Sequence, residues 1–177
     1  MWNEQIIMML LEGIKDTLYM TLTSTLIGYV IGLPMGILLT VTDKDGIHPN
    51  TAVYKVLDVI ANLIRSVPFL ILLIVLIPFT RFLIGRSYGP TATIVPLVIA
   101  AAPYIARMVE SSLKEVDAGV IEAARSMGAS NFTIVTKVML VEARTSLIVG
   151  ATISLGTILG YSAMAGTVGG GGLGDIA

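Results

Sequence analysis

The stretch TLYMTLTSTLIGYVIGLPMGILLTVT, at residues 17–42, contains no charged side chain and is largely aliphatic. A helix needs about 20 mostly apolar residues to cross the hydrocarbon core of a bilayer. Two more uncharged runs, residues 87–106 and 145–174, are also long enough, although the glycine-rich end of the second should leave the membrane. The sequence therefore predicts membrane-spanning helices.

A fourth candidate span, residues 56–84, is apolar but interrupted by Asp58, Arg65 and Arg81. One charge at the centre of a spanning helix costs about 2.5–3.5 kcal/mol. The segment can span if Asp58 and Arg65 lie near one interface or face other protein, and Pro68 should kink it. We therefore expect an all-α polytopic transmembrane helix bundle with four spans. A soluble helical core is disfavoured, because four such runs leave too little polar surface.

The composition agrees with a membrane protein. Charged residues make up 13% of the chain and the mean hydropathy is +0.88, whereas an average soluble domain is about 25% charged. The net charge of −1 gives no strong attraction to nucleic acid. The chain has no cysteine and a single histidine, His48. A disulfide framework and a thiolate or multi-histidine metal site are therefore excluded, and no metal site is predicted.

The Lys and Arg residues that flank the spans predict the orientation, because cytoplasmic segments carry an excess of them. One side has Lys44, Lys55, Arg107, Lys114, Arg125, Lys137 and Arg144, and the other side has Lys15, Arg81 and Arg86. We therefore expect the N-terminus outside the cell and residues 107–144 in the cytoplasm.

Four polar residues share one helix face at the start of the second span, because they are spaced three, four and three apart. They are Lys55, Asp58, Asn62 and Arg65. Ionisable residues inside a membrane suggest a function, and Asp58 and Arg65 could pair through Asn62 or with other helices. The alternative is that the charged members extend to the cytoplasmic headgroups. We favour this alternative for Lys55 and leave it open for Arg65.

Glycines recur at every fourth position in two of the spans. Gly28, Gly32 and Gly36 would lie along one face of the first helix and let a neighbouring backbone approach closely. For these three we expect tight packing within the chain. For Gly156 and Gly160, in the last span, packing and a subunit interface or mobile pore helix are equally open.

A polar segment separates the third and last spans. Asp117 can cap a short helix that runs to Met127, and Gly128 suits the left-handed residue after a helix end. The i, i+3, i+4, i+7 spacing puts Val120, Ala123, Ala124 and Met127 on one face, with Glu122, Arg125 and Ser126 on the other. Such a helix can dock a soluble partner or lie on the lipid surface, and composition does not separate the two.

This segment resembles the EAA loop of ABC importer permeases. The resemblance rests on Glu122-Ala123-Ala124, Gly128 and Val138-Met139-Leu140, and Val141 stands where the family pattern has proline. In that family the loop forms a coupling helix that docks into a groove on the ATPase subunit. The resemblance implies a coupling segment at residues 112–144 within a single transmembrane domain, residues 1–177. The implied coupling residues are Val120, Glu122, Ala123, Ala124, Arg125, Met127 and Gly128.

Three other segments resemble the permease subunits of bacterial methionine ABC importers. They are RSVPF at residues 65–69, APYIARMVE at residues 102–110 and GYSAM at residues 160–164. The likeness covers nearly the whole chain and implies an inner-membrane subunit that imports methionine by alternating access, with the L form expected and the D form open. It also implies a second copy of the chain, two ABC ATPase subunits that hold ATP and Mg, and an external methionine-binding protein. Family members have five spans, so a fifth is expected beyond Ala177.

Pore residues are expected near the outer end of the last span. We expect Met164 to act as a gate, because methionine makes adaptable apolar contacts, and Tyr161 and Ser162 to line the pore. Ordinary helix packing is the alternative for all three.

The sequence also limits what this chain does by itself. It has no catalytic constellation and no G-x-x-x-x-G-K-[ST] motif, so we expect no enzyme activity, no cofactor in this chain and ATP hydrolysis on a separate subunit. Gly169, Gly171 and Gly174 satisfy G-x-G-x-x-G by count, but they follow a span and should form an external turn. The rival functions are a permease for another amino acid, an ion-driven secondary transporter and a membrane scaffold.

Overall fold

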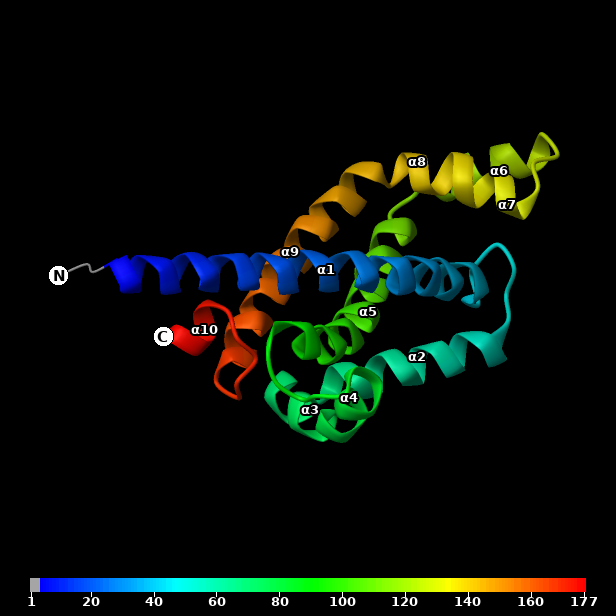
Figure 1. Cartoon of the computed structure of the whole chain (residues 1–177). Helices are drawn as coiled ribbons and strands as arrows, with labels where there is room; N and C mark the ends of the chain where they lie inside the picture. The colour runs from blue at the N-terminus through cyan, green and yellow to red at the C-terminus, as the bar shows by residue number, and fades with distance from the viewer. Residues whose placement is uncertain (1–3) are drawn as a thin grey trace.

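The protein is described by a computed structural model that covers residues 4–177. Its elements, in chain order, are α1 Glu4–Thr42, α2 Thr51–Ser66, α3 Phe69–Val75, α4 Ile77–Ile84, α5 Pro90–Lys114, α6 Ala118–Ser126, α7 Asn131–Thr133, the π-helix η1 Ile134–Met139, α8 Leu140–Glu142, α9 Arg144–Gly166 and α10 Leu173–Ile176. The predicted all-α class is confirmed (Figure 1). The first three residues of the predicted domain lie outside the described part of the chain.

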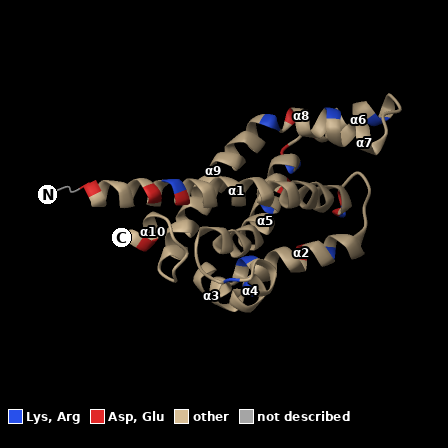
Figure 2. Cartoon of the chain, viewed as in Figure 1, with Lys and Arg blue, Asp and Glu red and all other residues tan. Residues whose placement is uncertain are grey.

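Three helices, α1, α5 and α9, are long and apolar enough to cross a membrane. They contain most of the three uncharged runs that predicted spans, and Figure 2 shows long stretches of α1 and α9 without charged side chains. Helices α2 and α3 pass the same test as a pair but meet at an angle of 102°. The described helices thus provide three spans, or four if the bent pair counts as one, and the four-span arrangement stays a prediction.

The break between α2 and α3 has a local cause. Proline removes a backbone donor and disfavours helical geometry in the residue before it. Val67, which precedes Pro68, is extended, with φ −86° and ψ 126°. This confirms the kink predicted at Pro68. A further helix end follows at Gly85, whose φ of 84° suits glycine.

Helix α5 occupies the centre of the molecule, with α1, α2, α4 and α9 against it (Figure 1). The packing of α1 is closest where its glycines meet α5. A Cβ atom added at Gly32 would lie 2.7 Å from the carbonyl oxygen of Ala102, and one at Gly36 would lie 2.5 Å from that of Ala106. Only a residue without a side chain fits these positions. The expected tight packing of the α1 glycines within the chain is therefore confirmed.

The glycine-bearing face of α9 differs from the glycine-bearing face of α1. A Cβ atom added at Gly156 or Gly160 would meet no described atom within 4 Å. Apolar side chains on α9 are exposed as well, among them Ile148, Val149 and Ile153. This face is open within the part of the chain that the structure describes.

The two ends of the molecule are built differently. At one end α10 folds back beside α1, where the backbone N–H of Leu173 donates to Oγ1 of Thr17 at 2.9 Å (Figure 1). The glycines before α10 form a turn, with φ values of 78° at Gly169 and 80° at Gly171. At the opposite end, α6 and α7 project from the helices that carry them.

Candidate coupling site

Helix α6 has well-defined ends. The Asp117 carboxylate accepts a 2.7 Å hydrogen bond from the backbone N–H of Gly119, which caps the first turn. Beyond the last turn, Gly128 has φ 82°, a conformation that costs side-chain-bearing residues energy. The predicted cap and the predicted left-handed glycine are both confirmed.

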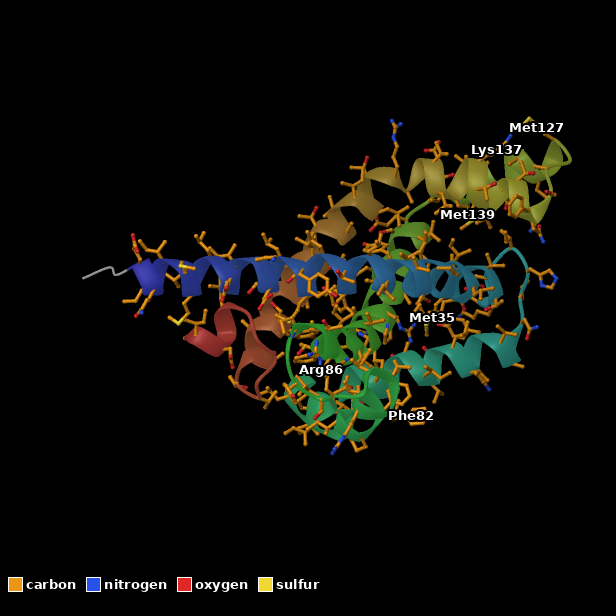
Figure 3. All side chains as sticks on the ribbon, viewed as in Figure 1. Met35, Phe82, Arg86, Met127, Lys137 and Met139 are labelled. Carbon is orange, nitrogen blue, oxygen red and sulfur yellow. The ribbon has the colours of Figure 1, made fainter. Side chains whose placement is uncertain are left out.

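Helix α6 buries little of its surface against the rest of the chain. Ala124 is buried and Ile121 is half-buried, and both belong to the core or pack against it. The remaining predicted coupling residues are exposed: Val120, Glu122, Ala123, Arg125, Met127 and Gly128. Met127 is 81% exposed and Phe132, just beyond it, is 78% exposed. Figure 3 shows Met127 at the tip of the molecule. Two exposed apolar side chains at a protruding tip are typical of a surface that binds another protein.

Arg125 ties α6 to the loop between α1 and α2. Its Nη2 donates to the carbonyl oxygen of Ile47 at 2.9 Å. Beneath this contact lies a cavity of about 500 Å³ between α6, the end of α5 and the loop, with Asp43, Lys114 and Glu122 in its lining. The periodicity of the sequence did not reveal this contact, because it joins residues 78 positions apart.

From α6 the chain returns to the membrane through a nearly continuous helical segment. Ser130 caps α7, accepting from the backbone N–H of Thr133 at 3.2 Å. The π-helix η1 and then α8 follow, and α9 begins at Arg144. Single-turn π segments often occur at functional sites. The backbone thus joins α6 to α9 through one turn and these short helical segments.

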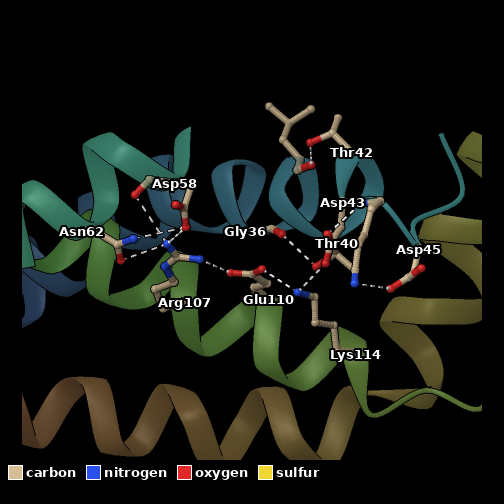
Figure 4. Close-up of polar contacts among 12 residues, drawn as sticks. Gly36, Thr40, Thr42, Asp43, Asp45, Asp58, Asn62, Arg107, Glu110 and Lys114 are labelled. Carbon is tan, nitrogen blue, oxygen red and sulfur yellow. Dashed lines mark hydrogen bonds and ion pairs between the residues drawn. The ribbon is translucent and has the colours of Figure 1, made fainter. Parts of the chain in front are cut away.

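A chain of charges joins α2, α5 and the end of α1 (Figure 4). Arg107 on α5 pairs with Asp58 on α2, and its Nη1 donates to Oε2 of Glu110 at 2.7 Å. Lys114 pairs with the other Glu110 oxygen at 2.8 Å and with Asp43 at 2.7 Å. The Glu110 side chain is only 7% exposed, so its charge is compensated by two cations rather than by water.

This cluster shows the partners of two residues of the predicted polar stripe, Asp58 and Asn62. Asp58 and Asn62 are joined by a 3.2 Å hydrogen bond, and Asn62 also accepts from Arg107 at 3.0 Å. The partner of Asp58 is thus Arg107 on another helix, one of the two possibilities that the sequence left open. Arg65 takes no part in the cluster and lines a separate cavity.

Asp43 lies just outside α1, and the largest effect on its pKa comes from Lys114. The hydrogen bond from Lys114 holds the pKa of the Asp43 carboxyl below its usual value, against a smaller opposing effect of burial. Asp43 therefore stays ionised at neutral pH and keeps its ion pair with Lys114.

The predicted pore residues lie on α9 in different surroundings. Tyr161 is half-buried and stacks on Phe69, with ring centroids 4.5 Å apart and planes 5° apart. Ser162 is buried and donates to the carbonyl oxygen of Leu159 at 2.8 Å. Met164 is 45% exposed. Residues 4–177 contain no group of three or more acidic or histidine side chains placed to hold a metal ion.

Comparison with known proteins gives consistent matches. Residues 8–177 match the family model described as binding-protein-dependent transport system inner membrane component. The chain is 51% identical over 164 residues to the D-methionine transport system permease protein MetI of Salmonella typhimurium, covering 93% of this chain and 76% of the relative. It is 47% identical over 169 residues to the probable D-methionine permease MetI of Vibrio cholerae, covering 96% and 75%.

Solved structures of ABC transporters also match the chain. The chain is similar to one in an inward-facing structure of the MetNI methionine ABC transporter, with a TM-score of 0.97 and 51% identity, covering 99% of this chain and 81% of that one. A structure of an amino acid ABC transporter with histidines matches with a TM-score of 0.78 at 23% identity, covering 97% and 77%. This second likeness concerns the fold alone.

Proposed function

The chain belongs to the family of binding-protein-dependent transport system inner membrane components, and from that premise we propose that it is the permease of an ABC importer for methionine. The assignment of methionine as the substrate rests on the high sequence identity to D-methionine permeases along more than nine-tenths of the chain. The importer would accept the L form, the D form or both.

The coupling site supports a role for a separate ATPase. Helix α6 exposes Val120, Ala123 and Met127 while Ala124 is buried, so it offers a protruding surface instead of a catalytic site. We propose that two ATPase subunits, which bind ATP and Mg, dock on α6 of two copies of this chain. An external methionine-binding protein would deliver the substrate to the opposite side.

The proposed mechanism is alternating access. ATP binding would draw the ATPases together, and each α6 would follow its ATPase. Because α6 is connected to α9 through the turn at residues 127–130, α7, η1 and α8, the movement would be passed to α9 and change access to the pore. Each ligand shifts such an equilibrium only by its difference in affinity for the two states.

The proposed orientation has the coupling segment 112–144 in the cytoplasm of a bacterium and the N-terminus outside. The Lys and Arg distribution supports it. The multi-pass placement in the inner membrane follows from the family and from the apolar helices α1, α5 and α9.

The rival based on an ion gradient is supported only by the polar stripe at Asp58 and Arg65. Within this stripe Asp58 is paired with Arg107 and Asn62, which leaves that rival with less support. A permease for another amino acid is the remaining alternative, and uptake measurements separate it from the proposal.

The decisive experiment is uptake of labelled amino acids by proteoliposomes that contain the permease with its ATPase. Binding protein is supplied on the side opposite α6, and ATP on the α6 side. We expect ATP-dependent methionine uptake that unlabelled methionine competes and other amino acids do not. Uptake of a different amino acid would overturn the substrate assignment, and uptake without ATPase would overturn the ABC assignment.

A further inference from the structure

A second, smaller cavity lies where the α2–α3 bend faces α5 and α9. It has a volume of about 190 Å³. The residues that matter for its chemistry come from all of these helices: Arg65, Phe69, Leu72, Ala100, Tyr104 and Tyr161. Binding sites in transporters typically form at discontinuous helices of this kind.

Arg65 gives this cavity its charge. It is the only ionisable side chain in the lining apart from the two tyrosines. Among residues 4–177, no carboxylate lies within ion-pair distance of its guanidinium. Arg107, in contrast, contacts both Asp58 and Glu110. The cavity therefore presents a positive charge that the described chain does not neutralise.

Arg65 lies within the bent pair of α2 and α3, which is a candidate span. It lies in the last turn of α2, which begins at Thr51, and a rise of 1.5 Å per residue puts it about 21 Å along the helix. Its side chain is exposed within the described chain, and an ionisable residue inside a spanning segment is expensive unless it has a function or a partner. A guanidinium is also well suited to carboxylates, which it binds through two parallel hydrogen bonds.

Much of the remaining lining of the cavity is apolar. Phe69 and Tyr161, whose rings stack on each other, line it together with the aliphatic side chains of Leu72 and Ala100. Thioethers pack favourably against aromatic rings. A cationic group and aromatic side chains in one cavity match the carboxylate and the side chain of an apolar amino acid.

We propose that this cavity is a transport subsite in which Arg65 binds the carboxylate of the transported amino acid and the Phe69–Tyr161 pair contacts its side chain. The inference rests on the proposed function for the substrate's identity, but the carboxylate requirement applies to every α-amino acid. Tyr104 adds a hydroxyl that can donate to the same carboxylate.

The test uses the full permease–ATPase complex in nanodiscs without binding protein, so that the binding protein contributes no site, and the ATPase alone is measured as background. Binding of labelled methionine is measured for wild type, Arg65→Met and Arg65→Lys, with methioninol, which lacks the carboxylate, as competitor. Losing a charge-assisted contact should weaken binding about tenfold to a hundredfold in Arg65→Met. Arg65→Lys should recover part of the loss, and methioninol should compete poorly.

The matched control is Arg81→Met, which removes an arginine from the last turn of α4, outside the cavity. It should bind methionine like wild type. Copurified ATPase and its basal activity verify that each variant is assembled. Unchanged methionine binding in an assembled Arg65→Met complex, or equal competition by methioninol, overturns the subsite.

Proteoliposome uptake of a panel of amino acids keeps the two proposals apart. If wild type takes up an amino acid other than methionine, the substrate assignment fails, and the binding assay is repeated with that amino acid and its alcohol. The subsite is then tested by the ratio of the dissociation constants of wild type and Arg65→Met for that amino acid. Equal constants overturn it.

Discussion

At the residue scale, the contact between α1 and α5 depends on missing side chains. Gly36→Ala places a Cβ atom 2.5 Å from the carbonyl oxygen of Ala106. Because backbone cannot yield as a flexible side chain does, α1 must shift away from α5. We expect a loss of about 1–3 kcal/mol in stability, measured as a lower thermal midpoint of the purified complex.

The control for this substitution is Gly156→Ala, where the added Cβ meets no described atom within 4 Å. In the same assay it should not lower the thermal midpoint, because alanine favours a helix over glycine. Equal destabilisation by the two variants would contradict the role of the α1 glycines. Dissociation of a dimer by Gly156→Ala alone would place that glycine at a subunit interface.

Also at the residue scale, the Asp43–Lys114 pair makes stability depend on pH. The pKa of Asp43 is lowered in the folded protein by the hydrogen bond from Lys114, so the pair stabilises fully above the ordinary aspartate pKa of about 3.9. This stabilisation is lost as the pH falls through the lowered pKa. Wild type should therefore exceed Asp43→Asn in thermal midpoint at neutral pH, and the difference should shrink in acid.

Asp45 provides the comparison for Asp43. Its contact with Lys44 is 3.8 Å long and both side chains are 83% exposed, and exposed pairs contribute little. Asp45→Asn should follow the wild-type pH curve. A constant gap between wild type and Asp43→Asn across the pH range would show that the pair is not the source of the difference.

At the element scale, the turn after α6 requires a positive φ. Gly128→Val would cost about 1–2 kcal/mol in the left-handed conformation and should displace the end of α6, so that less ATPase copurifies. Gly128→Asn keeps the turn accessible, since asparagine tolerates positive φ, and should retain the ATPase. Normal copurification with Gly128→Val would argue against the coupling role.

The elements also show how far local sequence patterns reach. Uncharged runs predicted α1, α5 and α9, and Asp117 and Gly128 predicted the ends of α6, because these signals are local. The partners Arg107 for Asp58 and Ile47 for Arg125 were missed, because each joins segments far apart in the sequence. The second candidate span was predicted with a single kink, whereas the structure divides it into α2, α3 and α4.

At the scale of the whole molecule, the gate hypothesis for Met164 can be tested by leakage. Met164 is partly exposed on α9, where a second copy of the chain could meet it. Met164→Ala should raise methionine leakage through proteoliposomes without ATP, because the shorter side chain leaves an opening. Ala163→Gly, which alters the adjacent position without removing a long side chain, serves as control. Unchanged leakage in Met164→Ala would show that Met164 does not act as a gate.

The charge chain from Asp58 through Arg107, Glu110 and Lys114 to Asp43 has a mechanical consequence. Its members alternate in sign and come from α2, α5 and the loop just after α1, so sliding α5 against either neighbour would separate an ion pair whose α5 partner is also paired with Glu110. Together with the glycine contacts of α1, these pairs would hold α1, α2 and α5 as a stator. Under the proposed mechanism the segment from α6 to α9 would be the lever arm, and the Arg125 contact with the α1–α2 loop would be its latch.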